Sequence, residues 1–376
     1  MIDLADIPEP DRLEDAPHPR HTSHLYGHQP AQDAFLNAFN SGRMHHAWLI
    51  SGPKGVGKAT LAWRLARFLL AMPENDGGMF AAPKPETLDI PDTNPVAHRL
   101  HALSEPRLFL IRRPWNDKTE TLRQDITVDE TRKLQTFLGL SAADGGRRVV
   151  IVDSADEMNR NAANGILKLL EEPPAKVTFL LIAHQPADLL PTIRSRCRDL
   201  RLGPLTPQDL NNALTQAGAE VPPSQREPLA QLAGGSVGEA YRLTTLDGLK
   251  LYALLIRLFS TMPKMDRPLA RLLSDNGANR RTPEAFDLTV TLIDAFLART
   301  ARAAALHAIP PEAAPGEAQL IERLANFPGA DRVWADLAQT LSLRARKGKA
   351  VNLDPAALLM DMVLKVDETA ANVAIR

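Results

Sequence analysis

The stretch GPKGVGKAT, from Gly52 to Thr60, decides the fold, because it matches a phosphate-binding loop at every position but one. The pattern requires Ser or Thr directly after Lys58, and this chain has Ala59 there. Thr60 is a poor substitute, since one step along a helix turns a side chain by about 100°. The candidate nucleotide-binding residues in this stretch are Gly52, Gly55, Gly57, Lys58, Ala59 and Thr60.

The segments around this stretch have the pattern that such a loop requires. Apolar residues 47–50 predict a short buried strand before it, and the amphipathic residues 61–70 predict a helix after it. Backbone N–H groups and the helix N-terminus would then face phosphate oxygens, and Lys58 would add a point charge. Because Ala59 offers no hydroxyl, we expect a retained loop with impaired Mg²⁺ binding, and we assign no metal ligand.

Strand and helix patterns alternate through the first half of the chain, which predicts an α/β fold with a parallel sheet covered by helices on both faces. After residue 204 the patterns are helical only. The expected strands are 107–111, 148–153 and 177–183, the expected helices are 32–39, 126–134 and 162–172, and 73–95 is an expected exposed insertion. The expected domains are a flexible lead-in at 1–22, a P-loop domain at 23–203, a small helical lid at 204–245 and an all-α domain at 246–376.

Composition excludes several classes of protein. The 376 residues include 44 Lys and Arg against 45 Asp and Glu, so no global basic excess indicates bulk binding to nucleic acid or membrane. The single cysteine, Cys197, excludes an internal disulfide and a multi-cysteine zinc site, and fits a cytoplasmic location. Residues 1–6 lack a signal-peptide pattern, and no run approaches the roughly 18 apolar residues of a membrane span.

Asp153 ends an expected strand about 95 residues after the phosphate loop, where nucleotide hydrolases place the carboxylate that positions Mg²⁺. We therefore add it to the candidate nucleotide-binding residues. Active ATPases usually follow this aspartate with a glutamate that orients water, but this chain has Ser154, a poor base at neutral pH. Asp156 and Glu157 would replace that glutamate only if the loop doubled back. The alternative is that Asp153 merely ends a strand.

Two other segments carry charge at unusual places. Glu171 and Glu172 end the expected helix at 162–172, where they face the negative end of the helix dipole. Either this helix end is simply solvated, or a tertiary contact offsets the cost. Arg196, between Ser195 and Cys197, follows the expected strand at 177–183 and so lies near the carboxyl edge of the sheet. Taken alone, a surface arginine beside a cysteine is only weak evidence for a functional site.

Together these segments resemble the bacterial DNA polymerase III clamp-loader subunits of the AAA+ class. The most specific pair is Leu-Glu-Glu-Pro-Pro at 170–174 with Ser-Arg-Cys at 195–197. The other matching segments are 42–47, 52–58, 150–153 and 164–169. The resemblance covers roughly residues 24–245 by motif, and the rest only by length and class. It implies an AAA+ P-loop domain, a lid, and a C-terminal collar that packs against partner subunits.

That family contains tau/gamma subunits, which hydrolyse ATP, and delta-prime subunits, which do not. The chain departs from the ATPase pattern at Ala59, at Ser154 and at Gly238, which stands where a sensor 2 arginine is expected. The sensor 1 position is also replaced, by Ala183 or His184. Metal coordination, water positioning and charge stabilisation can each be worth powers of ten in rate. The resemblance therefore implies the delta-prime kind, without ATPase activity of its own.

The same resemblance makes Arg196 an arginine finger that acts in trans on ATP held by a neighbouring tau/gamma subunit. The implied partners are tau/gamma and delta subunits and, through the complex, the sliding clamp and primer-template DNA, within a DNA polymerase III holoenzyme. Residues 71–106 contain no cysteine, so no zinc module is expected. Binding of ATP or ADP by this chain stays open. Because Lys58 and Asp153 are present, an active AAA+ ATPase of the tau/gamma type is the main alternative, and a small-substrate kinase is a remoter one.

Overall fold

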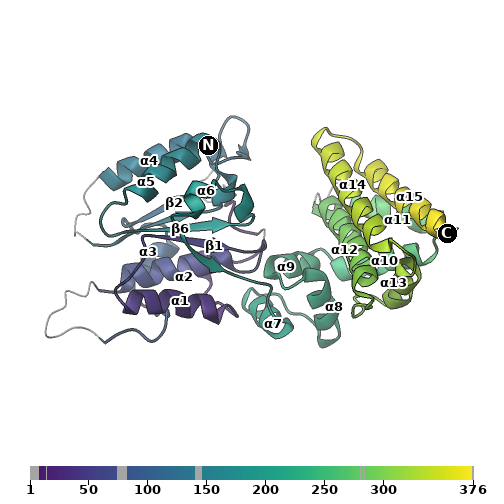
Figure 1. The fold of residues 1–376 in the computed structure, drawn as a ribbon, viewed down its shortest axis with the longest axis horizontal. Helices are drawn as coiled ribbons and strands as arrows, with labels where there is room; N and C mark the ends of the chain where they lie inside the picture. The colour runs from purple at the N-terminus through teal and green to yellow at the C-terminus, as the bar shows by residue number, and fades with distance from the viewer. Residues whose placement is uncertain are drawn as a thin grey trace. The chain divides into compact units, whose positions relative to one another are not determined.

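A computed structural model of the chain describes residues 8–13, 15–73, 83–139, 146–279, 282 and 284–374. The chain forms two compact units, which Figure 1 shows. The first contains Met1–Gly218 and Gly235–Gly238, and the second contains Ala219–Gly234 and Glu239–Arg376. The finer division expected at residues 22, 203 and 245 remains a prediction.

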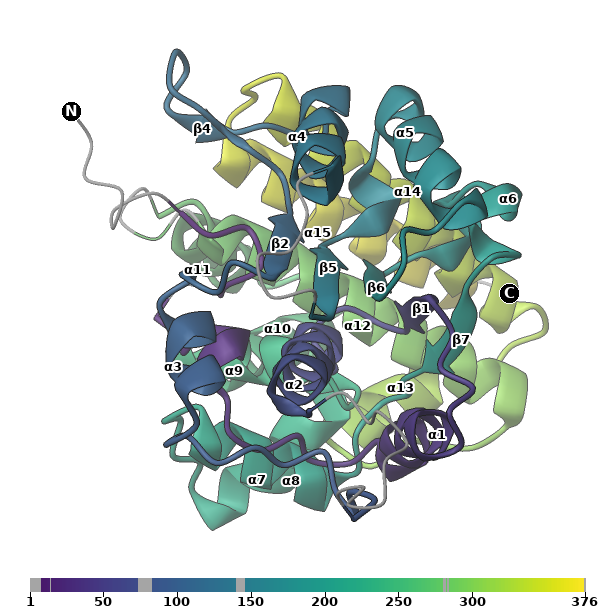
Figure 2. The same cartoon turned by 90° about the vertical axis from the view of Figure 1, so that its left-hand side faces the viewer.

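A five-stranded parallel sheet forms the centre of the first unit. Its strands are β1 (Ala47–Ser51), β2 (Leu108–Ile111), β5 (Arg148–Val152), β6 (Val177–Ala183) and β7 (Arg198–Arg201). They lie side by side in the order β2-β5-β6-β1-β7 (Figure 2). Because β1 and β5 both run parallel to β6, the residues that follow these three strands meet at one edge of the sheet.

Helices cover both faces of the sheet, which confirms the predicted α/β fold. One face carries α1 (Gln29–Asn40), α2 (Lys58–Ala71) and α3 (Pro95–His101), and the other carries α4 (Val128–Gly139), α5 (Arg160–Glu171) and α6 (Pro191–Arg194). Successive strand residues point to opposite faces, so Trp48 and Ile50 join the first core while Ala47 and Leu49 join the second. Strands buried on both sides need continuous apolar runs, as the sequence shows.

Several elements were not predicted from the sequence. Strand β7 lies at the edge of the sheet, and only Leu200 in it is buried, so it lacks the apolar run that marks the other strands. Helix α3 begins where the expected insertion ends. A small antiparallel hairpin, β3 (Trp115–Asn116) with β4 (Thr121–Leu122), follows β2. Part of the expected insertion, residues 74–82, lies outside the described residues.

The expected flexible lead-in, which the structure describes at residues 8–13 and 15–22, is partly packed against the first unit. His18 is only 2% exposed, and the short 3₁₀ helix η2 (Pro19–His21) lies against α2. The segment has few apolar residues, and its packing depends on polar contacts that no local pattern announces. Residues 1–7 of the lead-in lie outside the described residues.

The rest of the described chain is helical, as predicted. The first unit also contains η3 (Ala155–Glu157), η4 (Pro186–Asp188) and α7 (Pro207–Gln216). Helix α9 (Val237–Thr245) has its first two residues in the first unit and the rest in the second. The second unit contains α8 (Pro223–Ala233), α10 (Gly248–Ser260), α11 (Arg267–Gly277), α12 (Glu284–Leu306), α13 (Glu317–Ala325), α14 (Ala330–Ala350) and α15 (Pro355–Ala374). Within it, α12 packs along α14 and α11 packs against α15.

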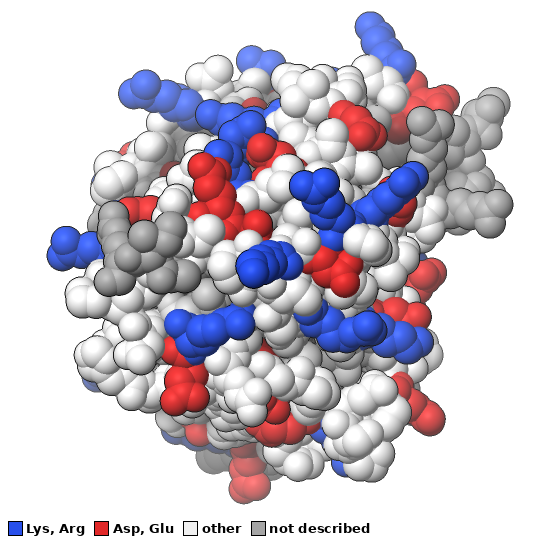
Figure 3. All heavy atoms as spheres, turned by 90° about the vertical axis from the view of Figure 1, so that its right-hand side faces the viewer, with Lys and Arg blue, Asp and Glu red and all other residues white. Residues whose placement is uncertain are grey.

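Charges of both signs are interspersed over the face of the second unit that Figure 3 shows. Ion pairs such as Arg344 with Asp361, at 3.2 Å, and Lys349 with Asp287, at 2.7 Å, join neighbouring helices. This mixture agrees with the near-zero net charge of the sequence. Among the helices described here, none combines the length and the apolar character that a membrane crossing needs.

Candidate functional site

The phosphate loop joins β1 to α2 at the carboxyl edge of the sheet. Gly52, Gly55 and Gly57 have φ angles of 144°, 78° and 104°, which side-chain-bearing residues rarely adopt. A Cβ atom on Gly52 would lie 2.2 Å from the carbonyl oxygen of Leu202. The loop therefore needs glycine for both its backbone conformation and its close approach to the neighbouring chain.

Lys58 begins α2 and is 3% exposed. Its ammonium donates hydrogen bonds to the carbonyl oxygens of Gly52, at 2.7 Å, and Pro53, at 2.6 Å. Burial lowers the pKa of Lys58 to about 8, although the charges of Asp153 and Asp156 oppose this shift. In this structure the lysine thus stabilises its own loop from within.

The two residues after the lysine differ in what they offer a ligand. Ala59 packs against the hydrophobic core under the loop and has no side-chain oxygen for a metal. Thr60 is half-buried at the next position of α2. Across the described ranges, His, Cys, Asp and Glu nowhere gather in a group of three or more that could hold a metal ion.

Asp153 lies directly after β5 and is 7% exposed. Burial, followed by the negative charge of Asp11, raises its pKa to about 7. The Ser154 hydroxyl donates to the Asp153 carboxylate at 3.1 Å and lies 3.0 Å from Nε2 of His184. Burial and the nearby charge of Lys58 lower the pKa of His184 to about 4, so this imidazole is neutral at pH 7.

The two acidic residues that follow Asp153 in the chain, Asp156 and Glu157, have hydrogen-bond or ion-pair partners of their own. Asp156 accepts hydrogen bonds from the backbone N–H groups of His184, at 2.9 Å, and Gln185, at 2.8 Å. The Glu157 carboxylate pairs with Arg113 at 2.9 Å. Both carboxylates therefore order the loops around the site, and the position after Asp153 holds serine.

The segment 235–238 closes one side of the loop. The Ser236 hydroxyl donates a hydrogen bond to the carbonyl oxygen of Lys54 at 3.0 Å. The backbone N–H of Gly238 donates one to the carbonyl oxygen of Gly55 at 3.1 Å. A Cβ atom on Gly55 would lie 2.3 Å from the Ser236 oxygen. The expected sensor 2 position, Gly238, thus contacts the loop through its backbone.

Arg196 lies in the turn between α6 and β7. Because β7 runs parallel to β1 and begins directly after this turn, Arg196 lies at the amino edge of the sheet, and the prediction that it lies near the carboxyl edge was wrong. Its guanidinium pairs with the Glu171 carboxylate at 2.8 Å and donates to the carbonyl oxygen of Thr192 at 3.0 Å. It is held to the end of α5, and its side chain is 36% exposed. Burial raises the pKa of the adjacent Cys197 thiol to about 12, which makes this cysteine unreactive.

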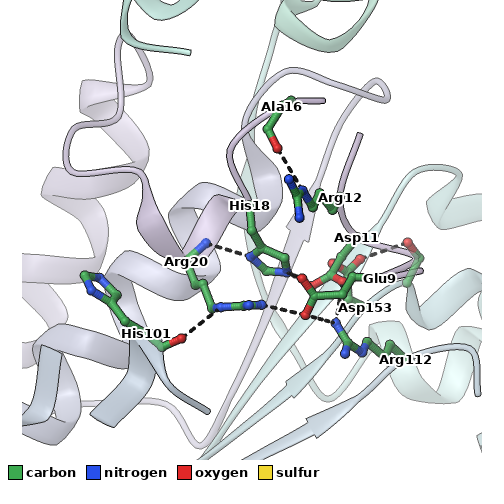
Figure 4. A network of polar contacts seen from close by, with 10 residues as sticks. Glu9, Asp11, Arg12, Ala16, His18, Arg20, His101, Arg112 and Asp153 are labelled. Carbon is green, nitrogen blue, oxygen red and sulfur yellow. Dashed lines mark hydrogen bonds and ion pairs between the residues drawn. The ribbon is translucent and has the colours of Figure 1, made fainter. Parts of the chain in front are cut away.

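The structure thus brings together the predicted loop residues, Asp153, Ser154 and His184, which is one of the two candidates for the sensor 1 position. Sequence reasoning missed Asp11, whose charge acts on Asp153, and Glu9, which shares the partner Arg112 with Asp11 (Figure 4). Their only signal was acidic charge in a segment without a hydrophobic pattern.

A glycine-rich loop between a strand and a helix, at the carboxyl edge of a parallel sheet, defines a P-loop α/β protein. The family model described as "DNA polymerase III, delta subunit" matches residues 27–206. Residues 27–206, slightly less than half of the chain, are thus similar to this family of DNA polymerase III subunits.

Individual relatives extend the match. The chain is 36% identical over 216 residues to DNA polymerase III subunit delta' of Pseudomonas aeruginosa, covering 57% of this chain but only 60% of that protein. It is 28% identical over 351 residues to subunit delta' of Escherichia coli K12, and that match covers 90% of this chain and 94% of that protein. It is 30% identical over 231 residues to subunit tau of Escherichia coli K12, and that match covers 60% of this chain and 33% of that protein.

Proposed function

We propose that this chain is a non-hydrolysing delta-prime subunit of the DNA polymerase III clamp loader. It would lend Arg196 to ATP bound by a neighbouring tau/gamma subunit and help to load the sliding clamp on primed DNA in the cytoplasm. Its partners would be tau/gamma and delta subunits, with the clamp and DNA reached through the complex. The likeness to both delta' and tau proteins supports a place in that complex.

One observation carries the proposal: the groups that cleave ATP are replaced while the loop is kept. Ala59 gives no metal oxygen, and Ser154 is hydrogen-bonded to Asp153 and His184 where a glutamate would orient water. Gly238 carries no cation. An ATPase that lacks these three groups loses metal positioning, water positioning and charge stabilisation together.

The finger assignment is tested in the reconstituted complex with tau/gamma, delta, clamp and primed DNA. An arginine finger is worth on the order of 10³ to 10⁵ in rate at the site it serves. Arg196→Ala should therefore remove the contribution of one ATP site and sharply reduce clamp loading. Arg194→Ala, an exposed arginine two residues earlier, is the matched control. Unchanged ATPase and loading with Arg196→Ala would refute the finger assignment.

The alternative function is an active ATPase of the tau/gamma type, which the presence of Lys58 and Asp153 favours. It predicts steady release of phosphate by the purified chain alone, abolished by Lys58→Ala. The proposed function predicts no such release. ATP or ADP bound without turnover would be compatible with the proposed function and not with the alternative.

A further inference from the structure

The described N-terminal residues, 8–13 and 15–22, form a strap that runs beside the phosphate-loop helix. The backbone carbonyl of Arg20 accepts a hydrogen bond from Arg67 of α2 at 2.7 Å. The His18 ring packs edge-on against Trp63 of the same helix, with 5.8 Å between ring centroids. These contacts fix the part of the strap that leads toward the carboxyl edge of the sheet.

Acidic residues anchor the end of the strap to that edge. The Asp11 side chain is 1% exposed and pairs with Arg112, which follows β2, at 2.8 Å and with His18 at 3.0 Å. Glu9 pairs with Arg20 at 2.6 Å and with Arg112 at 3.1 Å (Figure 4). Hydrogen bonds and opposite charges outweigh burial and lower the pKa of both carboxyl groups, so both are ionised at neutral pH.

The strap reaches both sides of the phosphate-loop mouth. At one side, the Asp11 carboxylate lies near Asp153 and its charge helps to raise the pKa of that group. At the other side, the Leu13 side chain lies 3.3 Å from the place that a Cβ atom of Gly238 would occupy. Gly238 is the residue whose N–H bonds to Gly55 of the loop. Residues 11–13 therefore extend from the aspartate after β5 to the segment over the loop.

The carboxylate of Asp11 in the strap opposes a nucleotide. The outer phosphates of ATP carry several negative charges, and hydrolases neutralise them partly with Mg²⁺. Ala59 provides no ligand for that ion, and Asp11 adds a second buried carboxylate beside Asp153. Like charges in a buried site repel much more strongly than in water. The Lys58 ammonium, which would attract phosphate, is engaged with Gly52 and Pro53.

We propose that the strap is a built-in plug of the phosphate loop: nucleotide enters only when residues 8–13 leave its mouth. The plug rests on the interpretation of residues 52–58 as a phosphate loop. The plug does not depend on the proposed role of Arg196. The plug is tested with the isolated chain, and the arginine finger is tested in the reconstituted complex, so either can fail without the other.

The test is an equilibrium titration of the purified chain with fluorescent ATP and ADP analogues, with and without Mg²⁺. The double variant Glu9→Gln, Asp11→Asn removes the ion pairs with Arg112 and two negative charges. It should bind at least about tenfold more tightly than wild type. Asp188→Asn, which neutralises an exposed carboxylate in the same unit, should bind as wild type does. Adding Lys58→Ala to the double variant should cancel the gain.

Hydrogen exchange of residues 8–13 in the same samples reports whether the strap has opened. Faster exchange together with tighter binding supports the plug. Faster exchange without tighter binding overturns it, and so does unchanged exchange, because the carboxylates then do not hold the strap. Equal affinity of wild type and of a chain that lacks residues 1–14 also overturns it. If the shortened chain does not fold, the full-length double variant decides.

Discussion

Arg196 places its guanidinium 2.8 Å from the carboxylate of Glu171, the last residue of α5. A carboxylate at a helix C-terminus faces the negative end of the helix dipole, which is locally unfavourable. Arg196, which lies in the turn between α6 and β7, offsets that repulsion. Two motifs that are separate in the sequence, Leu-Glu-Glu-Pro-Pro and Ser-Arg-Cys, therefore meet through one ion pair.

Removing this pair should change the stability of the chain very little. The two side chains are 36% and 42% exposed, and exposed pairs contribute about 0.2–1 kcal/mol. Glu171→Gln should therefore lower the free energy of unfolding by less than about 1 kcal/mol, close to the effect of Glu172→Gln at the adjacent exposed position. A double-mutant cycle with Arg196→Ala measures the coupling. A coupling energy above about 2 kcal/mol would mean that the pair is structural.

Alanine substitutions at three loop glycines should differ in cost because their surroundings differ. Gly42 has positive φ with open space around it, so Gly42→Ala should cost about 1–2 kcal/mol of backbone strain. In addition to backbone strain, Gly55→Ala brings a clash with the Ser236 side chain, which can move. Gly52→Ala brings a clash with the backbone carbonyl oxygen of Leu202, which is fixed. The loss of stability should rise in the order Gly42, Gly55, Gly52. Hydrogen exchange of β1 amides measures it, and equal losses would contradict the geometry.

The fold was largely predictable because its signals are local. Glycine spacing gives the loop, and continuous apolar runs give β1, β5 and β6. Strand β7 was missed because an edge strand with one buried residue, Leu200, has no such run. The sequence also indicates which catalytic groups are replaced, since Ala59 and Ser154 stand at fixed spacings from the motifs.

The surroundings of the site were not predictable, since they depend on contacts between distant residues. Asp11 and Arg112 are 101 positions apart, and Ser154 and His184 are 30 apart. Each pair consists of ordinary polar residues in segments without periodicity. Only the folded chain brings them together, and for that reason the lead-in was expected to be flexible.

In the second unit, Glu317 is the buried centre of a polar cluster. Its carboxylate accepts hydrogen bonds from the Tyr252 hydroxyl at 2.7 Å, from Arg299 at 2.6 Å and from the backbone N–H of Ala313 at 2.6 Å. Glu317→Ala leaves the buried guanidinium without a counter-charge and should cost about 3–5 kcal/mol. Thermal or urea unfolding measures the loss. The exposed Glu312→Ala is the control, and comparable losses for the two variants would contradict the cluster's importance.

Neutralising Asp153 should stabilise the chain in a pH-dependent way. Its pKa rises from 3.8 to about 7 on folding, so the native state holds this proton more tightly than the unfolded chain does. Stability is therefore lost as the pH rises from about 4 to about 7, because the ionised carboxylate is disfavoured where it is buried. Asp153→Asn cannot ionise. Its free energy of unfolding should match that of wild type near pH 4 and exceed it by roughly 4 kcal/mol at pH 8.

Denaturant unfolding of both proteins between pH 4.5 and 8 measures this difference. His184 also titrates, and its lowered pKa makes both proteins less stable as the pH falls from 6.5 toward 4. Because that contribution is common to wild type and variant, it cancels in the difference, whose growth toward high pH belongs to Asp153. Asp188→Asn, at an exposed carboxylate, should show no such growth. A difference for Asp153→Asn that stays constant with pH would mean that the carboxyl group ionises as freely in the folded chain as in the unfolded one.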